Sequence, residues 1–79
     1  MSEVKVEKKI DLSGLPCPMP VVKISKEIKT VEIGQIIEAR TTDPGALSDF
    51  PAWAQSSGNE IVKVEETGDG ATFYVKRTA

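Results

Sequence analysis

The hydrophobic period of the chain changes twice within its first half, and this constrains the fold more than any other feature. Apolar and charged residues alternate in residues 4–10, which is typical of a half-buried strand. Residues 18–31 instead space their apolar side chains by three, four and three positions, which predicts an amphipathic helix. Residues 35–42 return to a β-rich run without clean alternation, as expected for an interior strand. The chain therefore begins strand–helix–strand.

A second, shorter helix is predicted after the strand of residues 35–42. Pro51 would cost about 3 kcal/mol in the interior of a helix because it lacks an amide hydrogen. We therefore expect a loose turn at 44–49 and a helix over about 50–57, with Asp49 as its N-cap and Pro51 in its first turn. Gly58 is expected to end it.

Two strand-like runs, residues 60–67 and 71–78, flank Gly-Asp-Gly at 68–70, which predicts a hairpin. The order βαβαββ favours an α+β two-layer sandwich, a four-stranded mixed sheet with both helices on one face, formed by a single domain of residues 1–79. The predicted core residues are Ile24, Ile28, Val31, Leu47, Phe50, Val62 and Val64.

Composition excludes several classes of protein. A chain of 79 residues is long enough for one small domain only. Its residues are 39% hydrophobic and 28% charged, which is typical of a soluble globular protein. The net charge of −2 argues against direct DNA binding, so any RNA contact would be local. No apolar run is long enough for a membrane span, and the N-terminus lacks the pattern of a signal peptide. We therefore expect a cytoplasmic protein.

The chain has no histidine and one cysteine, Cys17. Cys–His and Ser–His catalytic pairs, histidine metal ligands, internal disulfides and CxxC redox couples are therefore all excluded. No metal or cofactor is expected. Cys17 is either a small packed hydrophobe or a thiol that reacts with something outside the chain.

The motif Cys17-Pro18-Met19-Pro20 opens the first predicted helix. A sulfur at a helix N-terminus faces the positive end of the helix dipole, and the Met19 amide is the donor that the two prolines leave nearby. This placement predicts a partly exposed Cys17 whose pKa lies below about 8.5, the value for a free thiol. Burial would cancel the effect, and the residues alone leave both possibilities open. Met19 is expected to face solvent.

Two further groups of residues allow both a structural and a functional interpretation. Lys23, Lys26 and Lys29 recur along one side of the first predicted helix, which is typical of a solvated face but would also orient an acidic or RNA-bearing partner. Phe50 and Trp53 are expected to pack in the core rather than to form a surface for a partner.

Two segments resemble a known family. Residues 11–20, Asp-Leu-Ser-Gly-Leu-Pro-Cys-Pro-Met-Pro, resemble the signature of the TusA/SirA-like sulfur carriers, in which the CPxP cysteine opens the first helix of a βαβαββ sandwich. Residues 42–53, with Thr-Asp-Pro followed by Asp-Phe-Pro-Ala-Trp, resemble the second recurrent segment of that family. The resemblance extends over essentially the whole chain.

The resemblance implies that Cys17 accepts sulfane sulfur as a persulfide and passes it on. The implied partners are a donor protein, such as a cysteine desulfurase or a rhodanese-like protein, and a DsrE-like or similar acceptor. Members serve tRNA thiolation, molybdenum-cofactor supply or dissimilatory sulfur metabolism, and no residue here selects among these. The chain is expected to act as a monomer, a carrier more than a catalyst. The residues expected to support Cys17 are Asp11 and Gly14, which shape the loop, and Pro18, Met19, Pro20, Lys23 and Lys26.

Other functions remain in competition with the carrier. A regulatory module that contacts RNA or protein through the first helix would leave Cys17 incidental, and replacing Cys17 by serine separates the two hypotheses. A thiol peroxidase or disulfide reductase is disfavoured because the chain has neither a resolving cysteine nor a histidine.

Overall fold

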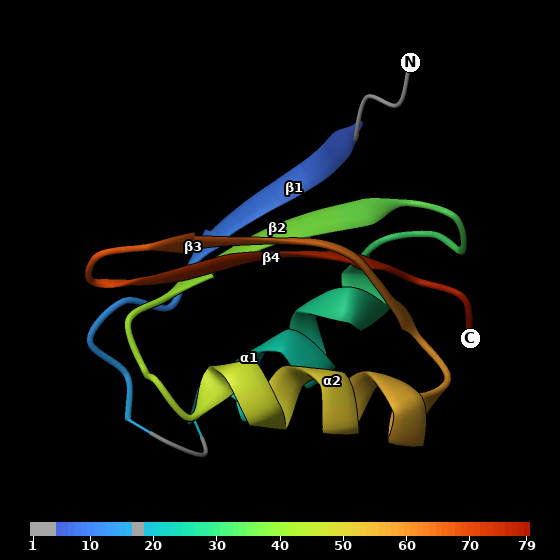
Figure 1. Ribbon diagram of the computed structural model, residues 1–79. Coiled ribbons are helices and arrows are strands. Elements are labelled where there is room, and N and C mark those ends of the chain that lie inside the picture. Colours follow the sequence, from blue (N-terminus) through green and yellow to red (C-terminus); the bar gives the residue numbers. More distant parts are fainter. Residues whose placement is uncertain (1–4, 17–18) are drawn as a thin grey trace.

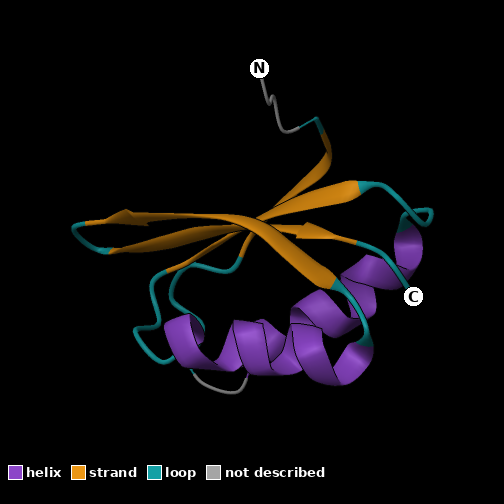
Figure 2. Cartoon of the chain, turned by 45° about the vertical axis from the view of Figure 1, so that its right-hand side comes forward, coloured by secondary structure: helices purple, strands orange, loops and turns teal. Residues whose placement is uncertain are grey.

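The computed structural model describes residues 5–16 and 19–79, and it confirms the α+β sandwich (Figure 1). Its elements are β1 (Val6–Asp11), α1 (Met19–Glu27), a 3-10 turn η1 (Ile28–Thr30), β2 (Ile36–Thr41), α2 (Ala46–Ser57), β3 (Glu60–Thr67) and β4 (Gly70–Lys76). Figure 2 shows both helices on one face of the sheet, whose other face is open to solvent.

The sheet is four-stranded and mixed, as expected, with the strand order β1-β2-β4-β3. β1 runs parallel to β2, whereas β4 is antiparallel to both of its neighbours. A parallel pair requires a crossover, and α1 supplies it. The Leu12 amide donates to the Arg40 carbonyl at 2.6 Å and so extends the β1–β2 pairing into the loop before α1.

The core lies between the sheet and the two helices. Every second residue of β2 and β4 points toward the helices, so that Ile37 pairs with Val75 and Ala39 with Phe73 on the buried face. The Phe50 ring of α2 stacks on the Phe73 ring at a centroid distance of 4.4 Å. The predicted core positions Ile24, Ile28, Val31 and Phe50 are confirmed as buried.

The first helix is shorter than predicted. α1 ends at Glu27, and residues 28–30 continue as a 3-10 turn before the backbone becomes extended at Val31. The tighter turn still places Ile28 on the buried side. At this end of α1, the Lys8 ammonium of β1 pairs with the Glu27 carboxylate and donates to Thr30 Oγ1 at 3.1 Å.

The predicted start of the second helix is wrong. α2 begins at Ala46 with Gly45 as its N-cap, so Asp49 lies in the first turn and Pro51 lies inside the helix. Ala46, Phe50 and Ala54 follow one another at four-residue spacing, and all three are buried. Burying this face offsets the hydrogen bond that Pro51 cannot make. α2 ends as expected at Gly58, whose amide donates to the Ala54 carbonyl at 3.0 Å.

Three predicted core residues are exposed: Leu47 by 43%, Val62 by 37% and Val64 by 41%. The earlier start of α2 buries Ala46, and Leu47 is rotated by about 100° away from it. β3 is an edge strand with a register irregularity between Ile61 and Lys63, so its apolar residues do not all reach the core. Leu47 is predicted from helical spacing, whereas Val62 and Val64 are predicted from strand alternation, which cannot identify an edge strand.

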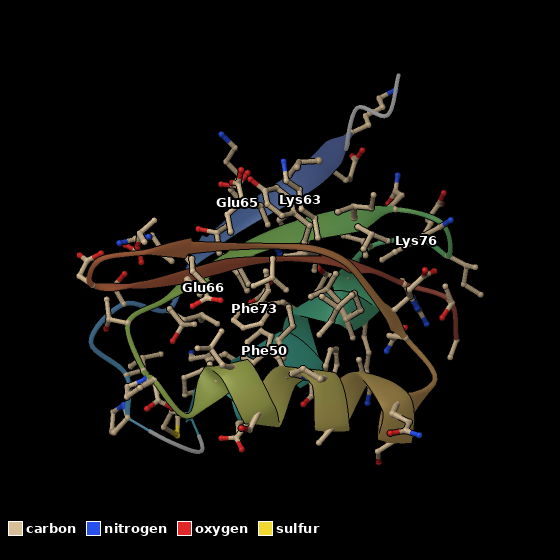
Figure 3. All side chains as sticks on the ribbon, viewed as in Figure 1. Phe50, Lys63, Glu65, Glu66, Phe73 and Lys76 are labelled. Atoms are coloured by element: carbon tan, nitrogen blue, oxygen red, sulfur yellow. The ribbon has the colours of Figure 1, made fainter. Side chains whose placement is uncertain are left out.

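The open face of the sheet carries a polar cluster on β3 and β4. The Tyr74 hydroxyl donates to Glu65 Oε1 at 2.9 Å, and the Lys63 ammonium lies 3.2 Å from Glu65 Oε2 and 5.6 Å from the Tyr74 ring centroid. Figure 3 shows Lys63 and Glu65 on the face opposite Phe50 and Phe73. The hydrogen bond to Glu65 and, to a smaller extent, burial raise the pKa of Tyr74 to about 12.

Candidate functional site: the loop before α1

The loop between β1 and α1 is held at its start by Asp11. The Ser13 amide donates to Asp11 Oδ1 at 3.0 Å, which confirms the predicted role of Asp11 as a loop acceptor. Hydrogen bonds from the Ser13 side chain and then from its amide lower the pKa of Asp11, and the positive charge of Arg40 acts in the same direction. Asp11 is therefore a carboxylate at neutral pH.

The middle of the loop is attached to the end of β2. Gly14 has a φ of +81°, a conformation that residues with a side chain adopt at a cost, which supports its predicted role in the turn. Its amide donates to Thr42 Oγ1 at 2.8 Å. Thr42 directly follows β2, so this hydrogen bond fixes the loop to the sheet.

The beginning of α1 differs from expectation in one respect. The Met19 amide donates to the Pro16 carbonyl at 2.8 Å, so it is not the free donor that the prolines were expected to leave for the sulfur. Met19 is 38% exposed, as predicted, whereas Pro20 is fully buried. Cys17 and Pro18 lie outside the described residues, so the predicted exposure and pKa of Cys17 stay predictions.

The remaining candidates are divided between surface and core. Lys23 and Lys26 are exposed on α1, and Lys29 is exposed in the 3-10 turn η1 that follows it. Phe50 is fully buried, and the half-buried Trp53 packs against the core with its ring centroid 6.4 Å from that of Phe50. The expected packing role of the aromatic residues is confirmed. A docking role for the lysines stays a prediction.

Two residues of this site were not singled out from the sequence. Ser13 supplies the donors for Asp11, and the Asp-x-Ser spacing of an Asx turn is a signal that could have identified it. Thr42 was noted only as part of a recurrent segment. Its contact with Gly14 joins residues far apart in the sequence, and no local pattern predicts such a contact.

Within residues 5–16 and 19–79, no three aspartate, glutamate, histidine or cysteine side chains are grouped closely enough to hold a metal ion. In the same part of the chain, neither helix has the length and apolar character that crossing a membrane requires.

Comparison with known proteins shows which family the chain belongs to. Residues 8–77 match the profile of the family described as Sulfurtransferase TusA. Sulfur carrier protein TusA of Allochromatium vinosum is 35% identical over 72 residues, which cover 91% of this chain and 95% of that protein. YrkI of Bacillus subtilis, whose description proposes a sulfur carrier, is 38% identical over 74 residues, covering 94% of this chain and 99% of YrkI.

Two further comparisons concern length and fold. A protein of Aquifex aeolicus, also described as a proposed sulfur carrier, is 40% identical over 79 residues, although the chain spans only 40% of its length. The crystal structure of a SirA-like protein from Desulfitobacterium hafniense aligns with a TM-score of 0.76 at 18% identity, covering 91% of this chain and 99% of that one. This structural similarity shows a shared fold. The profile match and the sequence identities lead to one conclusion: the chain belongs to the sulfurtransferase TusA family.

Proposed function

We propose that this protein carries sulfane sulfur as a persulfide on Cys17 and transfers it to a partner protein. The observation that carries the proposal is that the family match over residues 8–77 contains the one cysteine of the chain. Relatives of nearly the same length are described as sulfur carriers. A carrier needs one accessible thiol and no resolving cysteine, and the chain has a single cysteine and no histidine.

The anchored loop supports the proposal. Ser13 and Gly14 are tied to Asp11 and Thr42 by hydrogen bonds of 3.0 and 2.8 Å, so the segment that leads to Cys17 is held against the end of the sheet. After it, α1 begins at Met19 with an exposed side chain. A reactive cysteine between two fixed segments is presented to a partner at a lower cost in conformational entropy than one in a free loop.

The proposed transfer balances without an external oxidant. The Cys17 thiolate attacks the terminal sulfur of a donor persulfide, R–S–SH, and a new S–S bond forms as the donor S–S bond breaks. The donor leaves as the thiolate R–S⁻, and the proton stays on the transferred sulfur, which gives Cys17–S–SH. In the second transfer an acceptor thiolate attacks that terminal sulfur, and the Cys17 thiolate is released.

Both transfers depend on groups supplied by the partners. The chain has no histidine for general-base catalysis and no second cysteine to resolve the persulfide as an internal disulfide. The persulfide therefore persists on this protein until an acceptor thiol reaches it. We propose protein partners on both sides, a persulfide-forming donor such as a cysteine desulfurase and a thiol-bearing acceptor.

Intact-mass analysis tests the proposal. The reduced protein is incubated with a cysteine desulfurase and L-cysteine or, separately, with inorganic polysulfide. We expect an adduct of about 32 Da per sulfur atom that dithiothreitol removes, as a persulfide would be. Failure of both donors to load the wild-type protein contradicts the proposal.

The Cys17→Ser variant is the matched control, because it removes one sulfur atom and keeps the size of the side chain. It should gain no sulfur and should retain the circular dichroism spectrum of the wild type. Sulfur loading of this variant would contradict the proposal. A variant that no longer loads but keeps its full biological activity would favour the alternative, a binding module in which Cys17 is incidental.

A further inference from the structure

The β3–β4 hairpin projects past the N-terminal end of α2, so the helices do not cover the helix-facing side of its tip (Figures 1 and 2). A groove of about 310 Å³ lies there, between the hairpin and the loop that joins β2 to α2. One wall is formed by residues 42–44 and Leu47, and the other by residues 66–71. We call this feature the hairpin groove.

The hairpin groove has apolar walls. Leu47 is 43% exposed, although it lies on the helix whose other side forms the core. Pro44 is exposed beside it, and Ala71 closes the opposite wall with its side chain buried. An exposed leucine facing a concave surface favours contact with another apolar group.

Acidic side chains border the same groove. Asp43 accepts a hydrogen bond from the Gly45 amide at 3.3 Å, so the turn before α2 explains its presence. Glu66 has no such structural role. Across the described ranges 5–16 and 19–79, the Glu66 carboxylate takes part in no hydrogen bond or ion pair, whereas the Asp69 carboxylate is paired with Arg40 at 2.8 Å.

The side of the strand that carries Glu66 is fixed by the register. Glu66 pairs with Ala71, whose side chain points toward the helices. Figure 3 shows Glu66 on the helix side of the hairpin and Glu65 on the open face. Glu65 has partners in Lys63 and Tyr74, and Glu66 instead faces the hairpin groove. Its negative charge is therefore available to a ligand.

We propose that the hairpin groove is a docking site for a basic segment of a partner protein, which inserts an arginine or lysine side chain next to an apolar one. The aliphatic stem of such a side chain packs on Pro44 and Leu47, and its charged head reaches Asp43 and Glu66. Lys23 and Lys26 on α1 and Lys29 on η1 are exposed, so a basic segment is repelled there and attracted to the groove.

The position of the hairpin groove relates it to the loop before α1. Thr42 lines the groove, and its hydroxyl also accepts the Gly14 amide. A protein seated in the groove is therefore in contact with the residue that anchors this loop. The inference goes beyond the proposed function, because binding in the groove requires no chemistry at Cys17.

A peptide titration followed by NMR tests the proposal. The peptide acetyl-Arg-Leu-Arg-amide is added to the ¹⁵N-labelled, reduced full chain. We expect saturable amide shifts at Leu47 and across residues 66–71, which weaken as salt is added. The peptides acetyl-Glu-Leu-Glu-amide and acetyl-Arg-Ser-Arg-amide should bind more weakly. Absence of shifts in the groove, or equal binding of the acidic peptide, overturns the proposal.

Matched variants separate the groove from general electrostatics. Glu66→Lys should weaken binding of the arginine peptide about five- to tenfold, since an attraction becomes a repulsion. Glu60→Lys makes the same change of net charge at the other end of β3, and it should alter binding less than about twofold. Equal losses of affinity for the arginine peptide in the two variants overturn the proposal. Cys17→Ser should bind as the wild type does, which keeps this result independent of sulfur loading.

Discussion

At the scale of single residues, one threonine joins the loop before α1 to the sheet. The Thr42 hydroxyl accepts the Gly14 amide at 2.8 Å, and Thr42 is also part of the hairpin groove. A hydroxyl can accept this hydrogen bond, whereas a methyl group of the same size cannot. We therefore expect Thr42 to position the loop that leads to the proposed carrier site.

Thr42→Val should destabilise the protein by about 1 kcal/mol, because the Gly14 amide loses its acceptor. It should also slow sulfur loading from a cysteine desulfurase, since the loop before Cys17 is then less well positioned. Thr42→Ser keeps the hydroxyl and should restore both the stability and the rate. Urea unfolding and intact-mass time courses measure these effects. Equal loading rates for the valine and serine variants would argue against a positioning role.

Tyr74 is the one tyrosine of the chain, so its titration can be followed directly by ultraviolet absorbance. We expect a pKa of about 12, because the neutral hydroxyl donates to Glu65. Glu65→Gln should lower the pKa toward 10.0, the ordinary value of tyrosine. A pKa that stays the same in the Glu65→Gln variant would assign the shift to another cause.

Because the pKa of Tyr74 is raised in the folded protein, the free energy of unfolding depends on pH in a definite direction. The hydrogen bond of neutral Tyr74 stabilises the folded protein fully when the pH is below 10.0, the pKa of tyrosine in the unfolded chain. This stabilisation is lost as the pH rises through about 12, the pKa in the folded protein. Asp11 and Asp69 have lowered pKa values, so their contributions are present above the unfolded values and are lost as the pH falls through the folded ones. Stability should therefore fall at both extremes of pH.

At the scale of secondary-structure elements, α2 contains a proline that its own backbone does not favour. Pro51 lies inside α2 with an exposed side chain, so no core contact requires it there. The burial of Ala46, Phe50 and Ala54 decides where α2 begins. The local preference of Pro51 for a first turn is overridden by this packing.

Pro51→Ala should stabilise the protein by about 2 kcal/mol. The gain of about 3 kcal/mol in helix propensity is partly offset by about 1 kcal/mol, since alanine gives the unfolded chain more conformational freedom. Gln55→Ala, on an exposed position of the same helix, should change stability by less than about 0.5 kcal/mol. Urea unfolding of both variants provides the comparison. A destabilised Pro51→Ala would show that the proline makes a favourable contact.

The hairpin depends on a glycine where β4 passes β2. A Cβ atom on Gly70 would lie 2.2 Å from the Thr41 carbonyl oxygen, which is backbone and cannot rotate away. Gly70→Ala should therefore cost about 1–3 kcal/mol in unfolding free energy, as overpacking does elsewhere. Gly68→Ala has no atom within 4 Å of the added carbon and should be nearly neutral. Similar losses in the two variants would refute the close approach as the cause.

At the scale of the whole molecule, one core joins both helices to the sheet. Phe50 of α2 stacks on Phe73 of β4, and Ile24 of α1 is fully buried in the same cluster. Lys8 links β1 to the end of α1 through Glu27 and Thr30. No element of this core can be removed without exposing the others, so we expect the chain to unfold as one unit.

Thermal unfolding should show a single transition with a heat-capacity change of about 1 kcal/mol/K, which is the value for a domain of this length. The midpoint should not depend on protein concentration if the chain acts as a monomer. Differential scanning calorimetry at two concentrations measures both. Two resolved transitions would contradict a single domain, and a midpoint that rises with concentration would contradict a monomer.

Much of the molecule follows from local sequence. The two hydrophobic periods predict the order βαβαββ, and the Gly-Asp-Gly turn predicts the hairpin, because backbone geometry sets which positions share a face. The absence of histidine and of a second cysteine excludes internal disulfides and catalysis assisted by histidine. Asp11 and Gly14 were identified as loop residues because turn preferences act over a few positions.

The tertiary structure decided which side chains are exposed and which distant segments are in contact. It placed Leu47 and Val64 at the surface, since helical spacing does not reveal where α2 starts and strand alternation does not reveal that β3 is an edge strand. It joined Thr42 to Gly14 and formed the hairpin groove where the hairpin extends past α2. Local sequence thus determined the order of the elements and excluded several kinds of chemistry. The meeting of distant segments determined exposure and contacts, because burial is a property of neighbours that the sequence brings together only on folding.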